Sequence, residues 1–339
     1  MKAVGYTKSL PIDDPNALTD VELPKPTPKP RDLLVAVKAV SVNPVDTKVR
    51  KRAAPPAGET KILGYDAAGV VEAVGSEVTL FKPGDEVFYA GSIQRQGTNA
   101  EFHVVDERIV GHKPKTLDFA NAAALPLTAI TAWELLFDRL GAQPSKAFDP
   151  RTLLIIGGAG GVGSILIQLA RRLTGLSIIA TASRPETQAW CRELGAHAVI
   201  DHSKPMKAQV DALGLPPVAL IASLTNTDTH FTQLIDILAP QGKIGLIDDP
   251  VQPLNPMLLK AKSASLHWEA MFARSTFETA DMIAQHDLLD EVAGLIDAGV
   301  LRTTLDQTYG TINAANLKRA HALIESGKAK GKIVLEGWG

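Results

Sequence analysis

The pattern of hydrophobic and polar residues changes near residue 120. Before that point, short apolar runs such as 33–37 and 67–74 are bounded by Gly, Pro and Asp, which is typical of β-strands joined by turns. Residues 119–140 instead place apolar side chains at helical spacing, and Pro126 marks a break or a helix start within them. This pattern predicts a β-rich first part of the chain, followed by a helical segment.

The middle of the chain alternates strands with helices. Apolar runs typical of strands occur at 153–156, 177–181, 198–200, 218–221 and 243–247. These runs are nearly continuous, which indicates strands buried on both faces of a parallel sheet. Further helices follow residue 268, and a final strand is predicted at 332–335. The sequence therefore predicts an α/β fold with a doubly wound parallel sheet.

Length and composition fit an ordinary globular protein of two domains. The 339 residues correspond to two domains at the usual size of roughly 100–200 residues each. Hydrophobic residues make up 45% and charged residues 21%, so a sizeable core is expected. The formal net charge of -2 provides no general attraction to nucleic acid or to an anionic membrane. We expect neither as a partner.

The single cysteine limits the chemistry and the compartment. Cys191 cannot form an intramolecular disulfide or a metal site of several cysteines, and we assign it to packing. The N-terminal residues lack the apolar region of a signal peptide, and no run approaches the ~20 apolar residues of a membrane span. We therefore expect a cytoplasmic protein.

A glycine-rich turn is the strongest signal for function. The strand at 153–156 leads into Gly158-x-Gly160-x-x-Gly163 and then into an amphipathic helix. We assign Gly158 to the tight turn, Gly160 to close approach of a pyrophosphate, and Gly163 to close packing of helix on strand. The helix N-terminus would then face the phosphates. The alternative is a structural turn without a ligand. The predicted cofactor-binding residues of this turn are Gly158, Gly160, Gly161, Val162 and Gly163.

The end of the next strand distinguishes NAD from NADP. An NAD enzyme usually places Asp or Glu there to bind the ribose 2′-hydroxyl. Here the strand ends without an acid and Ser183 and Arg184 follow. Arg can pair with a 2′-phosphate in a bidentate manner, and Ser can donate a hydrogen bond to it. We predict NADP(H) as the cofactor; the alternative is that Arg184 is a solvated charge at a helix start.

Six sequence motifs lie at 43–46, 64–66, 83–85, 125–133, 157–163 and 331–335. Together they resemble the medium-chain dehydrogenase/reductase superfamily, in its zinc-lacking quinone oxidoreductase branch. The chain is similar to a bacterial subgroup labelled zinc-type alcohol dehydrogenase-like. The resemblance implies a GroES-like β-rich catalytic domain formed by 1–126 and 272–339, and a Rossmann NADP-binding domain at 127–271. It also implies a homodimer, for which 264–268 is the candidate edge strand.

The zinc ligands of metal-dependent relatives are missing. The resemblance matches Asn43 to the first ligand cysteine, Tyr65-Asp66 to a His-Glu pair, and Leu127-Thr128 to the region of the last cysteine. An amide, a phenol and an aliphatic side chain do not make a zinc site. The eight histidines form no compact ligand pattern either. We therefore predict no metal, and ordinary alcohol oxidation is disfavoured because no Lewis acid lowers the alcohol's pKa.

The resemblance places four candidate catalytic residues near the nicotinamide. Asn43 could donate to a carbonyl oxygen, and Lys48 or Tyr65 could hydrogen-bond or protonate the reduced product. Asp46 is either catalytic or a structural acceptor that orients its neighbours. Thr131 is expected to face the nicotinamide or to pack in a helix. Lys332 is expected near the cofactor or is a solvated charge.

Three more predicted cofactor-binding residues follow Rossmann strands. Ser223, Thr225 and Ile247 lie at the carboxyl ends of their strands, the edge at which open α/β sheets bind ligands. Met271 and Phe272 either line an apolar acceptor pocket or belong to the core or a dimer contact.

Together these features predict an NADPH-dependent oxidoreductase that transfers hydride to a quinone or an α,β-unsaturated carbonyl without zinc. Such acceptors need little electrophilic help because the charge spreads onto a conjugated oxygen. Two alternatives stay open. One is an NADPH-binding sensor or structural protein with little turnover, and the other is a zinc-dependent alcohol dehydrogenase.

Overall fold

The computed structural model describes residues 1–339, which divide into two compact units. Met1–Ile130 and Phe272–Gly339 form the first unit, and Thr131–Met271 form the second. The first boundary falls four residues later than the sequence suggested. The reason is that helix α3 (Pro126–Trp133) begins in the first unit, where the Leu127 amide donates to Asp66 Oδ1 at 2.8 Å.

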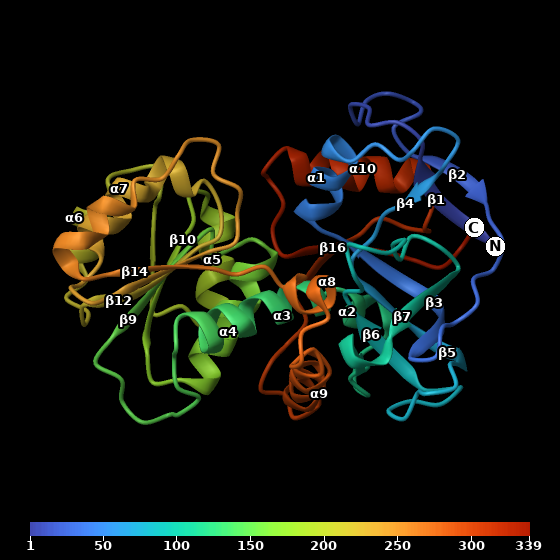
Figure 1. Ribbon diagram of the computed structural model, residues 1–339. Coiled ribbons are helices and arrows are strands. Elements are labelled where there is room, and N and C mark those ends of the chain that lie inside the picture. Colours follow the sequence, from blue (N-terminus) through green and yellow to red (C-terminus); the bar gives the residue numbers. More distant parts are fainter. The chain divides into compact units, whose positions relative to one another are not determined.

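The first unit is built on a sheet formed by both ends of the chain (Figure 1). Its central strand, β3 (Asp32–Val42), is buried along nearly its whole length. β5 (Ala67–Val74) pairs with β3 antiparallel, and so does β16 (Lys332–Glu336) from the end of the chain. The remaining strands of this sheet are β6 (Glu86–Tyr89), β7 (Phe102–Asp106), β8 (Val110–His112) and β15 (Leu305–Thr308). A second, small sheet holds β1 (Lys2–Tyr6), β2 (Thr19–Glu22) and β4 (Lys61–Ile62).

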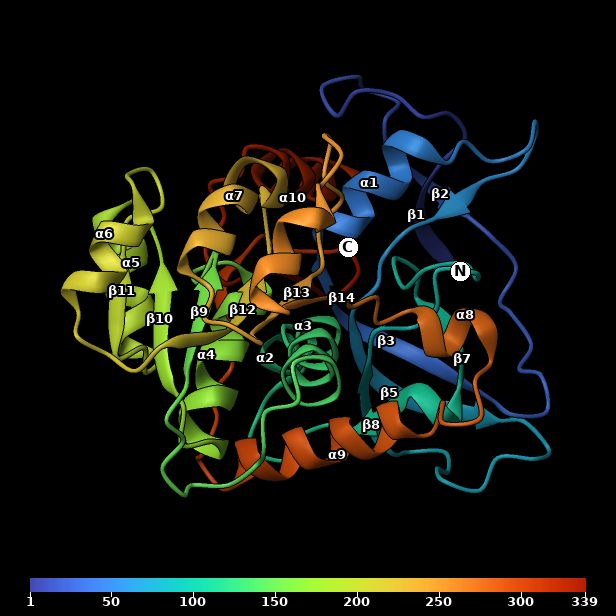
Figure 2. The same ribbon diagram turned by 60° about the vertical axis from the view of Figure 1, so that its left-hand side comes forward.

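Helices of the first unit pack on this framework. α10 (Ala314–Glu325) lies beside α1 (Pro44–Arg52), where the buried Arg50 guanidinium contacts the Leu10 carbonyl oxygen and Glu325. α9 (Ala284–Asp297) runs along β8 (Figure 2) and is tied to it by His286 Nδ1, 2.6 Å from the Val110 carbonyl oxygen. The other helices are α2 (Phe119–Ala123), α8 (Ala273–Phe277) and a 3-10 turn at Glu107–Ile109.

The second unit confirms the predicted doubly wound parallel sheet. All six strands are parallel, in the order β11-β10-β9-β12-β13-β14. Helices pack around the sheet (Figure 1), and its strands are apolar because both faces are covered. The strands are β9 (Thr152–Ile156), β10 (Ser177–Thr181), β11 (Ala198–Ile200), β12 (Val218–Ser223), β13 (Lys243–Leu246) and β14 (Ser265–Trp268). The helices are α4 (Gly161–Leu173), α5 (Pro185–Glu193), α6 (Met206–Ala212) and α7 (Thr227–Ile237), with a π-helical turn at Glu134–Arg139 and a 3-10 helix at Pro256–Lys262.

One helical stretch passes a length and composition test for a membrane span. Phe119–Arg139 is 21 residues long, and 83% of its apolar window is buried inside the protein. The apolar side chains of this stretch therefore face other protein atoms, as those of a buried core helix do.

Candidate active site

The glycine-rich turn joins β9 to α4, as the sequence predicted. Gly157 has a φ of +80°, which L residues with a side chain rarely adopt, so this position makes the tight turn. A Cβ on Gly158 would lie 2.8 Å from Ala180 Cβ of the neighbouring strand. The role assigned to Gly158 is therefore corrected: Gly157 forms the turn, and Gly158 allows β10 to approach.

The other two glycines of the motif differ in what surrounds them. A Cβ on Gly163 would meet the carbonyl oxygens of Gly157 and Gly158 at 2.5 and 2.6 Å, so this glycine is required by packing of the protein itself. A Cβ on Gly160 would meet no protein atom closer than 3.5 Å. Gly160 is the N-cap of α4 and has no side chain that caps the helix. The turn thus leaves space at the helix N-terminus that suits a pyrophosphate, with the half-buried Gly161 and Val162 in the first turn.

Polar groups at the end of β10 border this turn. The Thr181 hydroxyl accepts from the Gly157 amide at 3.0 Å and lies 3.1 Å from His202 Nδ1. Ser183 is exposed, and Arg184 is the N-cap residue of α5. The Arg184 Nε atom is 3.1 Å from Glu186 Oε1 in a half-exposed ion pair, which contributes little to stability.

The remaining residues predicted to bind the cofactor in this unit have different environments. Ser223 is buried at the end of β12, and its hydroxyl lies 2.8 Å from that of Thr227, so it helps to hold the start of α7. Thr225 is exposed next to Gly157, and Ile247 is half-buried directly after β13. Thr131 is buried.

Sequence reasoning missed how the start of α7 is held. Asp248 accepts from the Thr227 amide at 2.9 Å and from its hydroxyl at 2.5 Å. The only available signal was an acid that directly follows a strand, which by itself says nothing about its partner.

In the first unit, Asn43, Asp66 and Lys332 form a buried polar cluster. The Lys332 ammonium contacts Asp66 Oδ2 at 3.0 Å, the Val42 carbonyl oxygen at 3.1 Å and Asn43 Oδ1. The Asn43 Nδ2 atom donates to Asp66 Oδ2 at 2.7 Å. The amide of Asn43 is thus engaged at both ends, and donation to a substrate carbonyl would require it to leave these partners.

Two buried carboxyl groups fix the backbone in this region. Asp46 accepts from the amides of Asn43 at 2.7 Å and Gly64 at 2.9 Å, which makes it a structural acceptor at the start of α1. Burial raises the pKa of Asp46 to about 7, and the hydrogen bond from the Asn43 amide opposes that rise. Burial also raises the pKa of Asp66, while Lys332 and Asn43 lower it.

Tyr65 lies between Gly64 and Asp66 in the sequence. Both of these neighbours make hydrogen bonds, whereas the Tyr65 hydroxyl makes none within the protein. Its ring is buried and packs edge-on against Phe272, with the centroids 5.3 Å apart, so Phe272 is placed beside a candidate catalytic residue. The Tyr65 hydroxyl is buried and has no hydrogen-bond partner within the protein. Burial raises the pKa of Tyr65, so the hydroxyl is protonated and can donate. Lys48 is half-buried on α1.

The structure therefore groups Asn43, Asp46, Tyr65 and Lys332, and adds Asp66 as the acceptor that links Asn43 to Lys332. The alternative in which Lys332 is a solvated charge is excluded because the side chain is buried. The sequence indicates Asp66 only as part of the 64–66 motif and of the Tyr65-Asp66 match to a His-Glu pair. No group of three or more His, Cys, Asp or Glu side chains comes together in an arrangement that could hold a metal ion.

Comparisons with known proteins agree with this fold and these motifs. Residues 29–115 match the Alcohol dehydrogenase GroES-like domain family, and 194–335 match the zinc-binding dehydrogenase family. A zinc-type alcohol dehydrogenase-like protein of Staphylococcus aureus is 41% identical over 99% of both chains.

Solved structures give the same picture. A candidate zinc-dependent alcohol dehydrogenase from Rhizobium etli has a TM-score of 0.96 and 61% identity, covering 100% of this chain and 98% of that one. The quinone oxidoreductase of Escherichia coli complexed with NADPH has a TM-score of 0.83 and 25% identity, covering 99% of this chain and all of that one. With this sequence similarity, a GroES-like unit and a Rossmann unit, the chain belongs to the medium-chain dehydrogenase/reductase superfamily of oxidoreductases, together with the zinc-type alcohol dehydrogenase-like proteins.

Proposed function

We propose that this oxidoreductase uses NADPH to reduce a quinone or an α,β-unsaturated carbonyl, and that it does so without zinc. The observation that carries the proposal is the glycine-rich turn. Its packing requires Gly163, whereas nothing in the protein requires Gly160 to lack a side chain. A glycine that the protein does not need for its own packing is explained by close approach of a ligand phosphate.

The preference for NADP(H) rests on the end of β10. Ser183 and Arg184 stand where an NAD-binding chain usually carries an acid. Their position at the start of α5 adds a helix N-terminus, which favours an additional phosphate. The Glu186 carboxylate competes for the Arg184 guanidinium, so a 2′-phosphate must displace a surface ion pair of small energy.

The acceptor carbonyl needs a hydrogen-bond donor more than it needs a metal. Bound NADPH supplies the hydride. The negative charge that then develops on the carbonyl oxygen is stabilised by a donor aimed at it. Tyr65 supports this role because its buried hydroxyl has no partner within the protein, whereas Asn43 and Asp46 are engaged. Lys48 is retained as the second candidate donor.

The proposal is tested by NADPH oxidation with a panel of quinones and enones, together with elemental analysis of the purified protein. We expect turnover of at least one conjugated acceptor and no stoichiometric zinc. Tight NADPH binding without turnover of any acceptor would favour the sensor alternative. Stoichiometric zinc with oxidation of simple alcohols would favour the alcohol dehydrogenase alternative.

A pair of glycine variants separates cofactor binding from folding. Gly160 has a φ of -71° and a ψ of 177°, which alanine adopts without strain, so Gly160→Ala should fold normally. We expect its NADPH affinity to fall by at least ~10-fold because the new methyl group occupies the space left for the phosphates. Gly294→Ala is the control, since a Cβ there meets nothing within 4 Å. Unchanged NADPH affinity in Gly160→Ala would remove the main support for the proposal.

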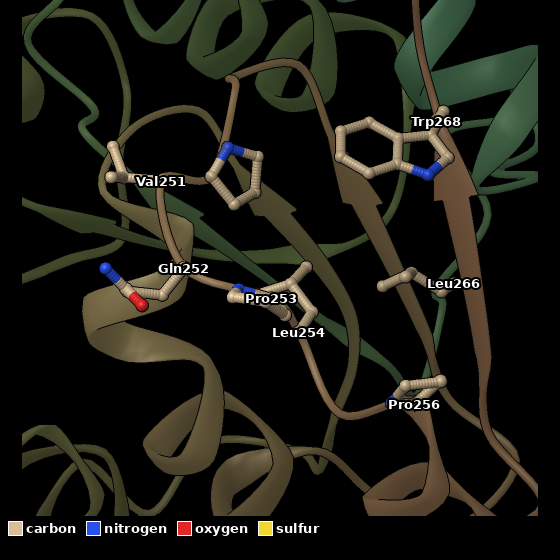
Figure 3. Close-up of a pocket in the computed structure, with 8 residues that line it drawn as sticks. Val251, Gln252, Pro253, Leu254, Pro256, Leu266 and Trp268 are labelled. Carbon is tan, nitrogen blue, oxygen red and sulfur yellow. The ribbon is translucent and has the colours of Figure 1, made fainter.

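We also propose that the protein is a cytoplasmic homodimer that pairs through β14. This strand ends the sheet and has β13 as its one neighbour. Figure 3 shows Leu266 and Trp268 on β14 facing an adjoining loop. These residues line a groove of about 490 Å³, and Trp268 is 54% exposed. An unpaired strand edge beside apolar side chains suits a second copy of the same strand. Trp268→Lys should then give a monomer in analytical ultracentrifugation, and a monomeric unmodified protein would refute the pairing.

A further inference from the structure

The ammonium group of Lys332 lies in a site made of oxygen atoms. Its three N–H donors have three acceptors: the Val42 carbonyl oxygen, Asn43 Oδ1 and Asp66 Oδ2. The Lys332 side chain is only 3% exposed, and the Asp66 side chain is fully buried. The number of acceptors matches the number of donors, so the ammonium has no donor left for another ligand.

The buried charges of this region depend on that ammonium. Asp46 and Asp66 are two carboxyl groups removed from solvent, and Lys332 contacts Asp66 directly. The other two buried lysine or arginine side chains of this unit have partners elsewhere: Arg50 is paired with Glu325 and Lys113 with Glu86. Removing one partner of a buried ion pair leaves an uncompensated charge, which costs far more than a surface pair would contribute.

Two buried carboxyl groups hold the residues that flank Tyr65, and Lys332 contacts one of them, Asp66. The Gly64 amide is bound by Asp46, whose second oxygen binds the Asn43 amide. On the other side, Asp66 is held by Lys332, Asn43 and the Leu127 amide. Tyr65 therefore lies on a segment of three residues fixed at both ends, and its own hydroxyl has no protein partner.

We propose that the Lys332 ammonium fills a built cation site, formed by Val42, Asn43 and Asp66, and acts there as a positioning residue for Tyr65. In this role Lys332 does not bind the cofactor phosphates. The cation site itself is independent of the reaction, whereas the effect on Tyr65 rests on the proposed function.

Chemical rescue tests the cation site. Lys332→Ala removes a group equivalent to propylammonium. We expect the apparent Tm to fall by roughly 5–15 °C because a buried carboxylate loses its partner. Added propylammonium should restore part of this loss in a saturable manner, and 1-propanol at equal concentration should not. Lys330→Ala is the control, since Lys330 lies two residues away in a partly exposed pair with Asp306 and should show no rescue. Equal effects of amine and alcohol on Lys332→Ala would overturn the proposal.

A second pair of variants covers the case in which Lys332→Ala does not fold. Lys332→Met leaves the Asp66 carboxylate without its cation, whereas Lys332→Met combined with Asp66→Asn removes both charges. We expect the double variant to unfold at a higher temperature than Lys332→Met alone, or to fold where the single variant does not. A double variant that is no better than the single one would overturn the cation site.

Cofactor binding and turnover test the positioning role. NADPH titration of amine-rescued Lys332→Ala, or of the double variant, should give a Kd within about 2-fold of the unmodified protein, since no phosphate contact is lost. A 10-fold or larger increase in Kd with normal kcat would instead make Lys332 a cofactor ligand.

The loss of kcat in the Lys332 variant should disappear in a Tyr65→Phe background, and an undiminished loss there would refute positioning. If the unmodified protein turned over no acceptor, the proposed function would fail while the rescue experiment still decided the cation site.

Discussion

A buried pair of glutamates in the second unit should make stability fall as pH rises. Glu269 directly follows β14, and its carboxyl group accepts from Arg139 Nε at 2.8 Å, with the Glu134 carboxyl group beside it. Both glutamates are buried, and Glu134 opens the π-helical turn. Burial, with Glu134 beside it, raises the pKa of Glu269 from 4.5 to about 8, against the opposing effect of Arg139. The pair therefore holds a proton at neutral pH.

The sign and size of the effect follow from proton linkage. Below about pH 4.5 the Glu269 carboxyl is protonated in both the folded and the unfolded state. Between about 4.5 and 8 the folded state keeps the proton and the unfolded state loses it, so the free energy of unfolding falls with pH by up to ~1.4 kcal/mol per unit. Across two pH units the loss is at most ~2.7 kcal/mol, and relaxation and water penetration around the buried carboxyl group reduce it to roughly 1–2 kcal/mol.

The variant Glu269→Gln isolates the contribution of the Glu269 carboxyl group to the pH dependence of stability. The glutamine can accept from Arg139 and donate to Glu134, but it does not ionise. Other titrating groups are shared with the unmodified protein and cancel in the difference. We expect the variant's Tm to gain roughly 2–8 °C on the unmodified protein between about pH 5.5 and 7.5, measured by thermal unfolding. Glu186→Gln, at an exposed site of the same unit, is the control and should show no such gain. Parallel pH profiles for Glu269→Gln and the unmodified protein would refute the reasoning.

Three further substitutions test the site residue by residue. Arg184→Ala should weaken NADPH binding about 10–150-fold, from ~1.5–3 kcal/mol for a charged hydrogen bond, and leave NADH nearly unchanged; equal weakening of both in titrations would contradict the NADP assignment. Tyr65→Phe should keep the Tm or raise it, because the lost hydroxyl has no protein partner, while kcat with a quinone falls ~100-fold; unchanged kcat would exclude Tyr65 as the donor. Gly163→Ala should destabilise the apoprotein by roughly 1–3 kcal/mol or more, since its Cβ would lie 2.5 Å from the Gly157 carbonyl oxygen; normal thermal unfolding would show that the turn adapts.

The glycine-rich turn was predictable because every residue that defines it is local. β9, the turn and α4 are continuous in sequence, and their apolar pattern identified the strand and the helix directly. The one error concerned which glycine makes the turn. Spacing alone did not separate Gly157, which has a positive φ, from Gly158, which is limited by Ala180 on the neighbouring strand. That distinction depends on strand pairing, which the motif does not contain.

The polar cluster of the first unit was not predictable either, because its contacts join residues that lie far apart in the sequence. Lys332 is 266 positions from Asp66 and 289 from Asn43, and no local pattern relates such residues. The sequence left Lys332 open between a solvated charge and a cofactor ligand, and left Asp46 open between catalysis and structure. Their buried contacts show that Lys332 is not solvated and that Asp46 accepts hydrogen bonds from two backbone amides.

Strand register explains why the end of the chain can complete the site. β16 pairs antiparallel with β3 so that Ile333 lies opposite Val42, which brings Lys332 next to Asn43 at the end of β3. Because side chains alternate between the two faces of a strand, a shift by one residue would turn Lys332 to the opposite face and remove the cation from Asp66. It would also exchange the faces on which the three buried apolar side chains of β16 pack, because this strand is buried on both faces. The packing of the last strand and the charge balance of the buried cluster therefore depend on the same register, so the core and the site stabilise each other.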